Sequence, residues 1–247
     1  METNANWLMR SIFKEYSGTP VSIMFLELNC IPIKFILMKR RIIYLHYLLC
    51  QDEKSLLYNF FMIQANDSVN GDWAKTVKSD LNLIGLSMTF NDIKSHSTNQ
   101  FKSLVGEKIR EYTFKWLIAE KNKLKSVKHI KYDRFEMQNY LLSDKINTTE
   151  KMLLFQMRTK TLPLYAYRKF DHPDGNLNCP FCDKEEDTLY HQITCSVINK
   201  GLNWITRGTI NIENIYSNNL QLQTDTLLAF QTIYKRRVHL LSYFKTT

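Results

Sequence analysis

Glycine and proline are scarce in this chain, and a long uninterrupted apolar run is missing. The 247 residues include 7 Gly and 5 Pro, too few for a disordered chain or a turn-rich all-β fold. The most apolar stretch, residues 21–50, is interrupted by Glu27, Lys34 and the triplet Lys39-Arg40-Arg41, which argues against a simple membrane span. Residues 1–18 mix charged and polar side chains, so no secretory signal is expected. The sequence predicts a mainly α-helical protein without a membrane partner.

Familiar catalytic motifs are missing as well. The chain has no Tyr/Phe-x-Asp-Asp pair for a two-metal polymerase, no glycine-rich phosphate loop and no Gly-x-Ser-x-Gly elbow. Pro173-Asp174 could open a nuclease motif, but no acidic-x-Lys partner follows. The acidic run Glu185-Glu186-Asp187 is expected to be solvent-exposed rather than to act in acid–base chemistry. We therefore expect a protein that is not an enzyme.

Cysteine is also sparse, but three of the five cysteines fall in one motif, Cys-x2-Cys-x8-His-x3-Cys. Its residues are Cys179, Cys182, His191 and Cys195. Thiolates and a neutral imidazole suit tetrahedral Zn²⁺, and four protein ligands leave no position for a substrate water. The motif predicts a structural zinc knuckle, with His172 as a substitute ligand. Unoxidised cysteines beside such a site fit a reducing compartment, the nucleus or the cytoplasm.

The alternative interpretation of these thiols is less specific. Cysteines are common buried apolar residues, and Cys179 and Cys182 could form part of a core or a redox pair. Pro180 and the polar residues around the pair instead favour a turn. The other two thiols, Cys30 and Cys50, lie in apolar runs and are expected in the core.

The net charge of +9 is concentrated in the middle of the chain. Residues 101–170 hold 16 Lys and Arg against 7 Asp and Glu, whereas residues 1–100 hold 10 against 9 and residues 171–247 hold 7 against 8. A basic segment beside a zinc knuckle indicates a polyanionic partner, RNA or DNA. Lysines 121, 123, 125 and 128 are expected on a solvated connection that neutralises phosphates. The alternative is that such lysines merely cover a solvated face.

Helical periodicity and end signals recur along the chain. We predict a helix after Pro32, one after an Asp52 cap, one ending at Gly85, a long one after residues 97–98, one started by an Asn147 to Glu150 capping box, and a last one over residues 220–244. The helix after Pro32 is expected to bury most of its circumference, through Ile33, Ile36, Leu37, Arg40, Ile43, Tyr44, Tyr47 and Leu48. Arg40 and Arg41 must then reach outward or meet a phosphate. The next helix is expected to bury Leu56, Leu57, Phe60, Phe61 and Gln64.

These elements suggest three segments. We predict a helical region over residues 1–90, a basic helical linker over residues 91–170, and the zinc knuckle with a C-terminal helix over residues 171–247. The basic triplet at residues 235–237 is expected to complement the dipole of that last helix.

Several motifs occur in a specific order, and together they carry a family resemblance. They are residues 31–50, Gly71-Asp-Trp73, Glu136 to Leu142, Phe155 to Thr159, and the knuckle from Cys179 to Cys195. From about residue 20 to its end, the chain resembles the C-terminal region of non-LTR (LINE-type) retrotransposon reverse transcriptase polyproteins.

The resemblance implies thumb-like helices and a linker, followed by a zinc knuckle, that help to hold template RNA or target DNA. It also implies that Lys39, Arg40 and Arg41 face nucleic acid. The polymerase aspartates are missing, so the expected function is non-catalytic nucleic-acid binding. The alternative is a helical interaction or remnant protein in which zinc only holds the C-terminal module together. The oligomeric state is not predicted by the sequence.

Overall fold

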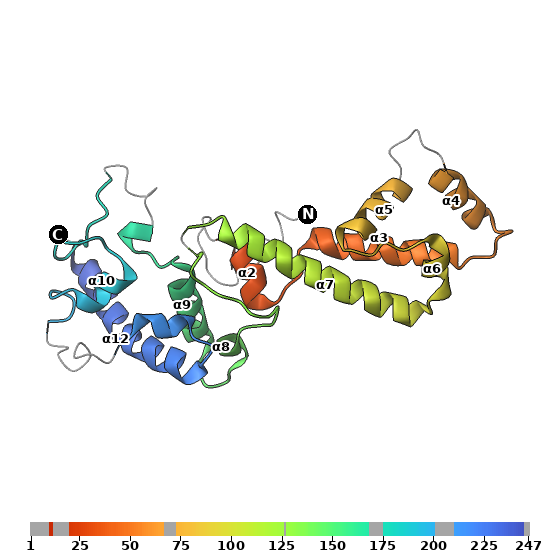
Figure 1. The fold of residues 1–247 in the computed structure, drawn as a ribbon. Helices are drawn as coiled ribbons and strands as arrows, with labels where there is room; N and C mark the ends of the chain where they lie inside the picture. Colours follow the sequence, from red (N-terminus) through yellow and green to blue (C-terminus); the bar gives the residue numbers. More distant parts are fainter. Residues whose placement is uncertain are drawn as a thin grey trace. The chain divides into compact units, whose positions relative to one another are not determined.

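The computed structural model describes residues 10–11, 20–66, 73–125, 127–167, 175–200 and 210–244 (Figure 1). These residues are mainly helical and include no strand, only an isolated bridge between Asn178 and Glu186. The predicted mainly α fold is confirmed. The described residues form two compact units: unit 1 contains residues 29–120, and unit 2 contains residues 10–28 and 121–244. These units are defined by contacts in space, whereas the three segments expected above were defined by sequence signals. The division into three segments stays a prediction.

Unit 1 is built around an apolar core. Its helices are α3 (Ile33–Leu49), α4 (Leu56–Asn66), α5 (Trp73–Leu83), α6 (Phe90–Ser95) and most of α7 (Thr98–Asn122). The buried residues of this core include Ile42, Leu45, Val77, Ile93, Phe101, Val105 and Ile109. Phe35 of α3 packs edge-to-face against Tyr112 and Trp116 of α7, with ring centroids 5.5 and 5.3 Å away. One apolar stripe of the long helix α7 therefore faces the core.

The helix ends of unit 1 follow local rules. Pro32 directly precedes α3, as predicted. Gly85 follows α5 with φ of 74°, where an L side chain would be strained. The cap of α4 differs from the expectation. Asp52 accepts a hydrogen bond from the Lys54 N–H at 2.8 Å, while the Ser55 hydroxyl accepts from Tyr58 N–H at 3.2 Å. Ser55 thus caps α4, and Asp52 stabilises the preceding turn.

The buried face of α3 differs from the predicted one. The residues buried are Phe35, Met38, Ile42, Leu45, His46, Leu48 and Leu49. Ile36, Leu37, Tyr44 and Tyr47 are exposed, and Tyr47 retains 51% of its accessible surface. Helix α3 carries apolar side chains around its whole circumference. Hydrophobic periodicity therefore could not predict which face α5, α6 and α7 cover.

Helix α4 also departs from expectation. Phe61 is buried, but Leu56 and Phe60 are 85% and 61% exposed, and Ile63 is exposed beside them. Residues 56, 60 and 63 lie on one face, because side chains three and four positions apart are neighbours on a helix. One apolar face of α4 is therefore uncovered within the described residues.

Unit 2 contains several short elements and one long C-terminal helix. They are α2 (Val21–Leu28), α8 (Asn139–Leu142), α9 (Thr148–Thr159), a 3-10 turn η1 (Tyr165–Tyr167), α10 (Leu189–Thr194), a second turn η3 (Ile212–Tyr216) and α12 (Leu220–Phe244). The last helix packs against α8, α9, α10 and η3, and its Leu227, Phe230 and Ile233 are fully buried. The predicted start of α9 and the predicted extent of α12 are confirmed. Asn147 and Glu150 form the predicted capping box, with hydrogen bonds of 3.0 and 2.8 Å.

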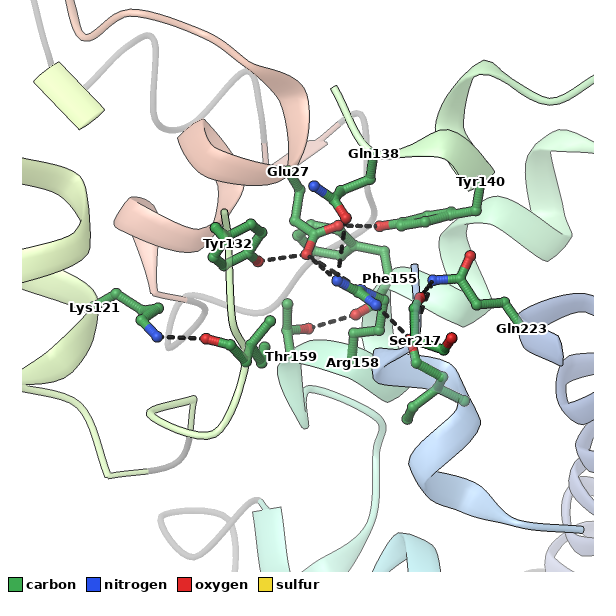
Figure 2. Close-up of polar contacts among 12 residues, drawn as sticks. Glu27, Lys121, Tyr132, Gln138, Tyr140, Phe155, Arg158, Thr159, Ser217 and Gln223 are labelled. Carbon is green, nitrogen blue, oxygen red and sulfur yellow. Dashed lines mark hydrogen bonds and ion pairs between the residues drawn. The ribbon is translucent and has the colours of Figure 1, made fainter. Parts of the chain in front are cut away.

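A buried ion pair lies among these elements (Figure 2). Glu27 of α2 and Arg158 of α9 are 0% and 1% exposed, and two guanidinium nitrogens lie 3.0 and 3.2 Å from one carboxylate oxygen. The hydroxyls of Tyr132 and Tyr140 donate to the same carboxylate, the second at 2.8 Å. Arg158 also donates to the carbonyl of Ile215.

The charges of this network are internally satisfied. Burial raises the pKa of both tyrosine hydroxyls, which therefore stay protonated and donate. Burial lowers the pKa of Arg158, but Glu27 together with Tyr140 and Tyr132 outweighs it, and the net shift of the pKa is upward. A carboxylate with four donors is compensated for its desolvation, which an isolated buried charge would not be. The network joins α2 to segments more than a hundred residues later.

Within the described residues, no single helix is both long and apolar enough to cross a membrane, and only α2 and α3 taken as a broken pair reach the required length and composition.

Candidate metal centre and basic residues

Four predicted ligands come together in unit 2. Cys179 and Cys182 lie on a turn, His191 lies in α10, and Cys195 follows the end of that helix. Their ligand atoms all lie within 4.8 Å of one another. Cys179 Sγ is 3.9 Å from Cys195 Sγ, and Cys182 Sγ is 3.3 Å from His191 Nε2. This group, the Cys3His group, could hold a metal ion. His172 lies outside the described residues.

The backbone around the first two thiols forms a tight turn. The Asp183 N–H donates to the Cys179 carbonyl at 2.9 Å, and the Cys179 N–H donates to the Glu185 carbonyl at 2.8 Å. Asp183 has φ of 52°, a region that aspartate tolerates better than most residues. The chain therefore reverses directly after Cys182, and both sulfurs are held on one side of the turn.

The second pair of ligands is positioned by a short helix. The Thr188 hydroxyl accepts from the His191 N–H at 3.1 Å and so caps α10. The Cys195 N–H donates to the His191 carbonyl at 2.7 Å. Residues four apart share one face of a helix, so both side chains point toward the turn.

Two of the distances among these ligand atoms are close to those around a tetrahedral ion. Zn–S bonds of about 2.3 Å and a Zn–N bond of about 2.05 Å give S···S edges of about 3.8 Å and S···N edges of about 3.6 Å. The two distances given above differ from these edges by a few tenths of an ångström. Three sulfurs and one imidazole nitrogen form a donor set typical of structural zinc sites.

The histidine has a supporting carboxylate. His191 Nδ1 lies 2.9 Å from Glu185 Oε2, and the histidine is 5% exposed. A neutral imidazole that donates from Nδ1 keeps the lone pair of Nε2 directed at the thiols, as in the carboxylate–histidine arrangement of metal sites. The acidic residue lies on the loop between the second and third ligands, so the motif carries its own orienting group.

The thiols have different acidities. Burial raises the pKa of Cys179 to about 12. Burial also acts to raise the pKa of Cys182, but the N–H of Lys184 and the neighbouring side chains of the group outweigh it, so that pKa is lowered. A bound metal ion would deprotonate its thiol ligands. The remaining thiols do not belong to this group, and Cys50 is exposed rather than in the core as expected.

A second buried ion pair anchors the loop of the Cys3His group. Arg237 of α12 and Asp187 are 1% and 0% exposed and share two hydrogen bonds of 2.9 and 2.6 Å. Asp187 also accepts from the Tyr165 N–H at 2.9 Å and from the Gln192 side chain at 2.5 Å. The guanidinium carbon lies 5.4 Å from the centre of the Phe181 ring.

This pair corrects two expectations. Asp187 was expected in solvent and Arg237 at the helix dipole, but both are buried. A signal was present in the sequence, because Arg237 falls four residues after Ile233 and seven after Phe230, on the buried stripe of α12. A charged residue on an apolar stripe indicates a buried partner, although the pattern does not identify it.

The lysines at the end of α7 and in the segment after it are not all exposed. Lys121 is 4% exposed, and its ammonium donates to the carbonyls of Lys128, at 3.3 Å, and Ile130. Burial lowers its pKa. The expectation of a solvated Lys121 is wrong, because carbonyls of the following turn replace water around its ammonium. Lys123, Lys125 and Lys128 are exposed and could meet phosphates.

The triplet of α3 is similarly divided. Arg41 is paired with Asp80 of α5, at 2.8 Å from Nε and 2.7 Å from Nη2. Lys39 is half-buried, with Nζ at 3.2 Å from the position that a Cβ on Gly106 would occupy. Arg40 is exposed. The structure therefore leaves one of the three predicted contacts fully open to a ligand.

Comparisons with protein-family models, with curated proteins and with solved structures find no match to this chain.

Proposed function

We propose that this chain is a non-catalytic nucleic-acid-binding protein whose C-terminal module is held by a structural Zn²⁺ ion. The observation that carries the proposal is the Cys3His group, in which Cys179, Cys182, His191 and Cys195 place four suitable donors within 4.8 Å. The ion would bind the three sulfurs and His191 Nε2, and it would link the turn to α10. With four protein ligands, its role is to stabilise the module.

The nucleic-acid part of the proposal is supported by charge. The chain carries a net charge of +9, and Lys123, Lys125 and Lys128 expose their side chains on one short segment. Clustered exposed cations bind phosphate backbones without reading sequence. The resemblance to the C-terminal region of retrotransposon reverse transcriptases points to the same ligand, RNA or DNA, and to a nuclear or cytoplasmic location.

The metal is tested by elemental analysis of freshly reduced protein. We expect one zinc per chain, lost in the Cys182→Ser/His191→Ala double variant and kept in a Cys50→Ser control, whose exposed thiol lies outside the group. A protein without zinc after reduction and reconstitution would refute the metal centre.

Nucleic-acid binding is tested by titrating labelled RNA at several salt concentrations. Each phosphate that the protein neutralises releases counterions. For single strands, each such contact contributes about −0.7 to the slope of log K against log salt concentration. The triple variant Lys123→Ala/Lys125→Ala/Lys128→Ala should flatten that slope. A charge-matched control, Lys54→Ala/Lys75→Ala/Lys184→Ala, changes exposed lysines elsewhere and should have a smaller effect. Equal effects would remove the assignment of this segment.

A second candidate function is protein interaction, with zinc acting only as an internal link. It is favoured by the uncovered face of α4, where Leu56, Phe60 and Ile63 are exposed. An apolar helix face of this kind can lie in a partner's groove. RNA binding that is absent at low salt would favour this candidate over the first.

A further inference from the structure

One exposed surface of unit 1 combines aromatic rings with cations. Tyr44 and Tyr47 of α3 are 46% and 51% exposed, and their rings stack with centroids 5.8 Å apart and an interplanar angle of 19°. Arg40 precedes them by four and seven residues, so all three side chains share one face of the helix. Buried aromatic residues need no explanation, but an exposed stacked pair beside a cation is unusual for a helix that otherwise packs in a core.

A hollow lies against this face. It has a volume of about 420 Å³, and it is lined by the three residues above together with Ile43, His46, Cys50, Thr98 and Lys102. Lys102 is exposed, and within the described residues neither it nor Arg40 takes part in an ion pair. Arg40 of α3 and Lys102 of α7 thus line the same hollow as the two tyrosine rings.

The end of a helix adds to this positive field. Thr98 is the first residue of α7, which runs for 25 residues. The N–H groups of a first helical turn carry partial positive charge and favour anions. The partial positive charge of this helix end supplements the two side-chain cations that line the same hollow.

We propose that this surface, the Arg40–Tyr47 platform, binds single-stranded nucleic acid by stacking a base on the tyrosine pair and placing the adjoining phosphates at Arg40, Lys102 and the start of α7. The ligand is a single strand because the faces of bases in a duplex are already stacked on each other. Stacking on aromatic side chains tolerates any base, so the platform distinguishes strand state rather than sequence. The inference rests on the proposed nucleic-acid binding and specifies its ligand and location.

The platform is tested by fluorescence anisotropy, which measures the binding of a labelled uridine oligonucleotide and of a duplex of equal length. Loss of one stacking partner weakens binding about 5- to 150-fold, and we expect this for Tyr47→Ala. Tyr47→Phe keeps the ring and should bind like the unmodified chain. The matched control is Tyr190→Ala, which removes a tyrosine that is 67% exposed in unit 2 and should leave affinity unchanged. Circular dichroism melting verifies that each variant folds.

A charge variant completes the test. Arg40→Ala/Lys102→Ala should lower affinity and flatten the salt dependence, whereas Tyr47→Ala should lower affinity at an unchanged slope. An unmodified chain that binds no nucleic acid would refute the proposed function together with the platform. Binding that Tyr47→Ala reduces no more than Tyr190→Ala, or a duplex bound as tightly as the single strand, would overturn the platform and leave the proposed function standing.

Discussion

The two units bury different chemistry. Unit 1 is held mainly by apolar contacts, and its ion pair between Arg41 and Asp80 keeps the arginine side chain 34% exposed. Unit 2 buries two ion pairs completely, Glu27–Arg158 and Asp187–Arg237, and holds the Cys3His group as well. Apolar packing tolerates many substitutions of similar volume, whereas a buried charge requires its particular partner. Unit 2 therefore depends on a few specific residues, whereas unit 1 depends on the sum of many apolar contacts.

Metal removal should separate the units most strongly. Structural zinc contributes about 10 kcal/mol or more to the folded state of small zinc modules. We expect a chelator to unfold the segment around Cys179 and His191 while the core of unit 1 stays folded. Hydrogen exchange read by mass spectrometry, peptide by peptide, measures this. Loss of protection in α3 and α5 at the same chelator concentration would contradict the difference between the units.

Breaking the Glu27–Arg158 pair should have the next largest effect. Arg158→Leu leaves a buried carboxylate without its counter-ion, so we expect the free energy of unfolding of unit 2 to fall by about 3 to 5 kcal/mol. The double variant Glu27→Leu/Arg158→Leu should be less destabilised than Arg158→Leu, because no unpaired charge remains. Denaturant titration monitored in unit 2 provides the measurement. A double variant less stable than the single one would show that the pair matters through shape rather than charge.

Helix caps should affect both units alike. Thr89 caps α6 in unit 1 and Asn147 caps α9 in unit 2, each in a capping box. Replacing either by alanine should cost about 1 kcal/mol. Thermal melting of the two variants tests whether local helix rules are independent of the surrounding core. A cost several times larger in unit 2 would show that α9 is coupled to the buried network.

The partly exposed pair of unit 1 should matter least. Arg41→Ala removes a salt bridge whose arginine side chain is 34% exposed, so water can reach the buried Asp80 carboxylate that the variant leaves. We expect a loss of at most about 1 kcal/mol. The loss should shrink in high salt, because salt screens exposed charges. A loss as large as that of Arg158→Leu would remove the distinction between the two kinds of ion pair.

Local signals were sufficient for much of this fold. Pro32, Gly85 and the Asn147 capping box mark helix ends because backbone hydrogen bonds and φ angles at those positions depend on one or two side chains. The Cys3His group was predicted for a similar reason, since a short turn and a short helix place all its ligands within 17 consecutive residues.

Long-range relations were not available from the sequence. Apolar residues occur around the whole circumference of α3, so its buried face depends on which helices pack there, and Tyr44 and Tyr47 were assigned to the core. Lys121 was assigned to solvent because the carbonyl of Ile130 that satisfies it depends on the path of the following turn. Glu27 and Arg158 are separated by more than a hundred residues, and neither residue alone indicates its partner.

The pairing of Asp187 with Arg237 has a consequence for the order of assembly during synthesis. The ribosome adds the residues of the turn, α10 and Cys195 before it adds Arg237, because the chain is made from its N-terminus. During that interval the Asp187 carboxylate has the Tyr165 N–H and the Gln192 side chain as protein donors but lacks its guanidinium. Asp187 therefore cannot reach its final buried and paired state until α12 has been made. Completion of the module waits for Arg237, which is added 42 residues after the last cysteine of the Cys3His group.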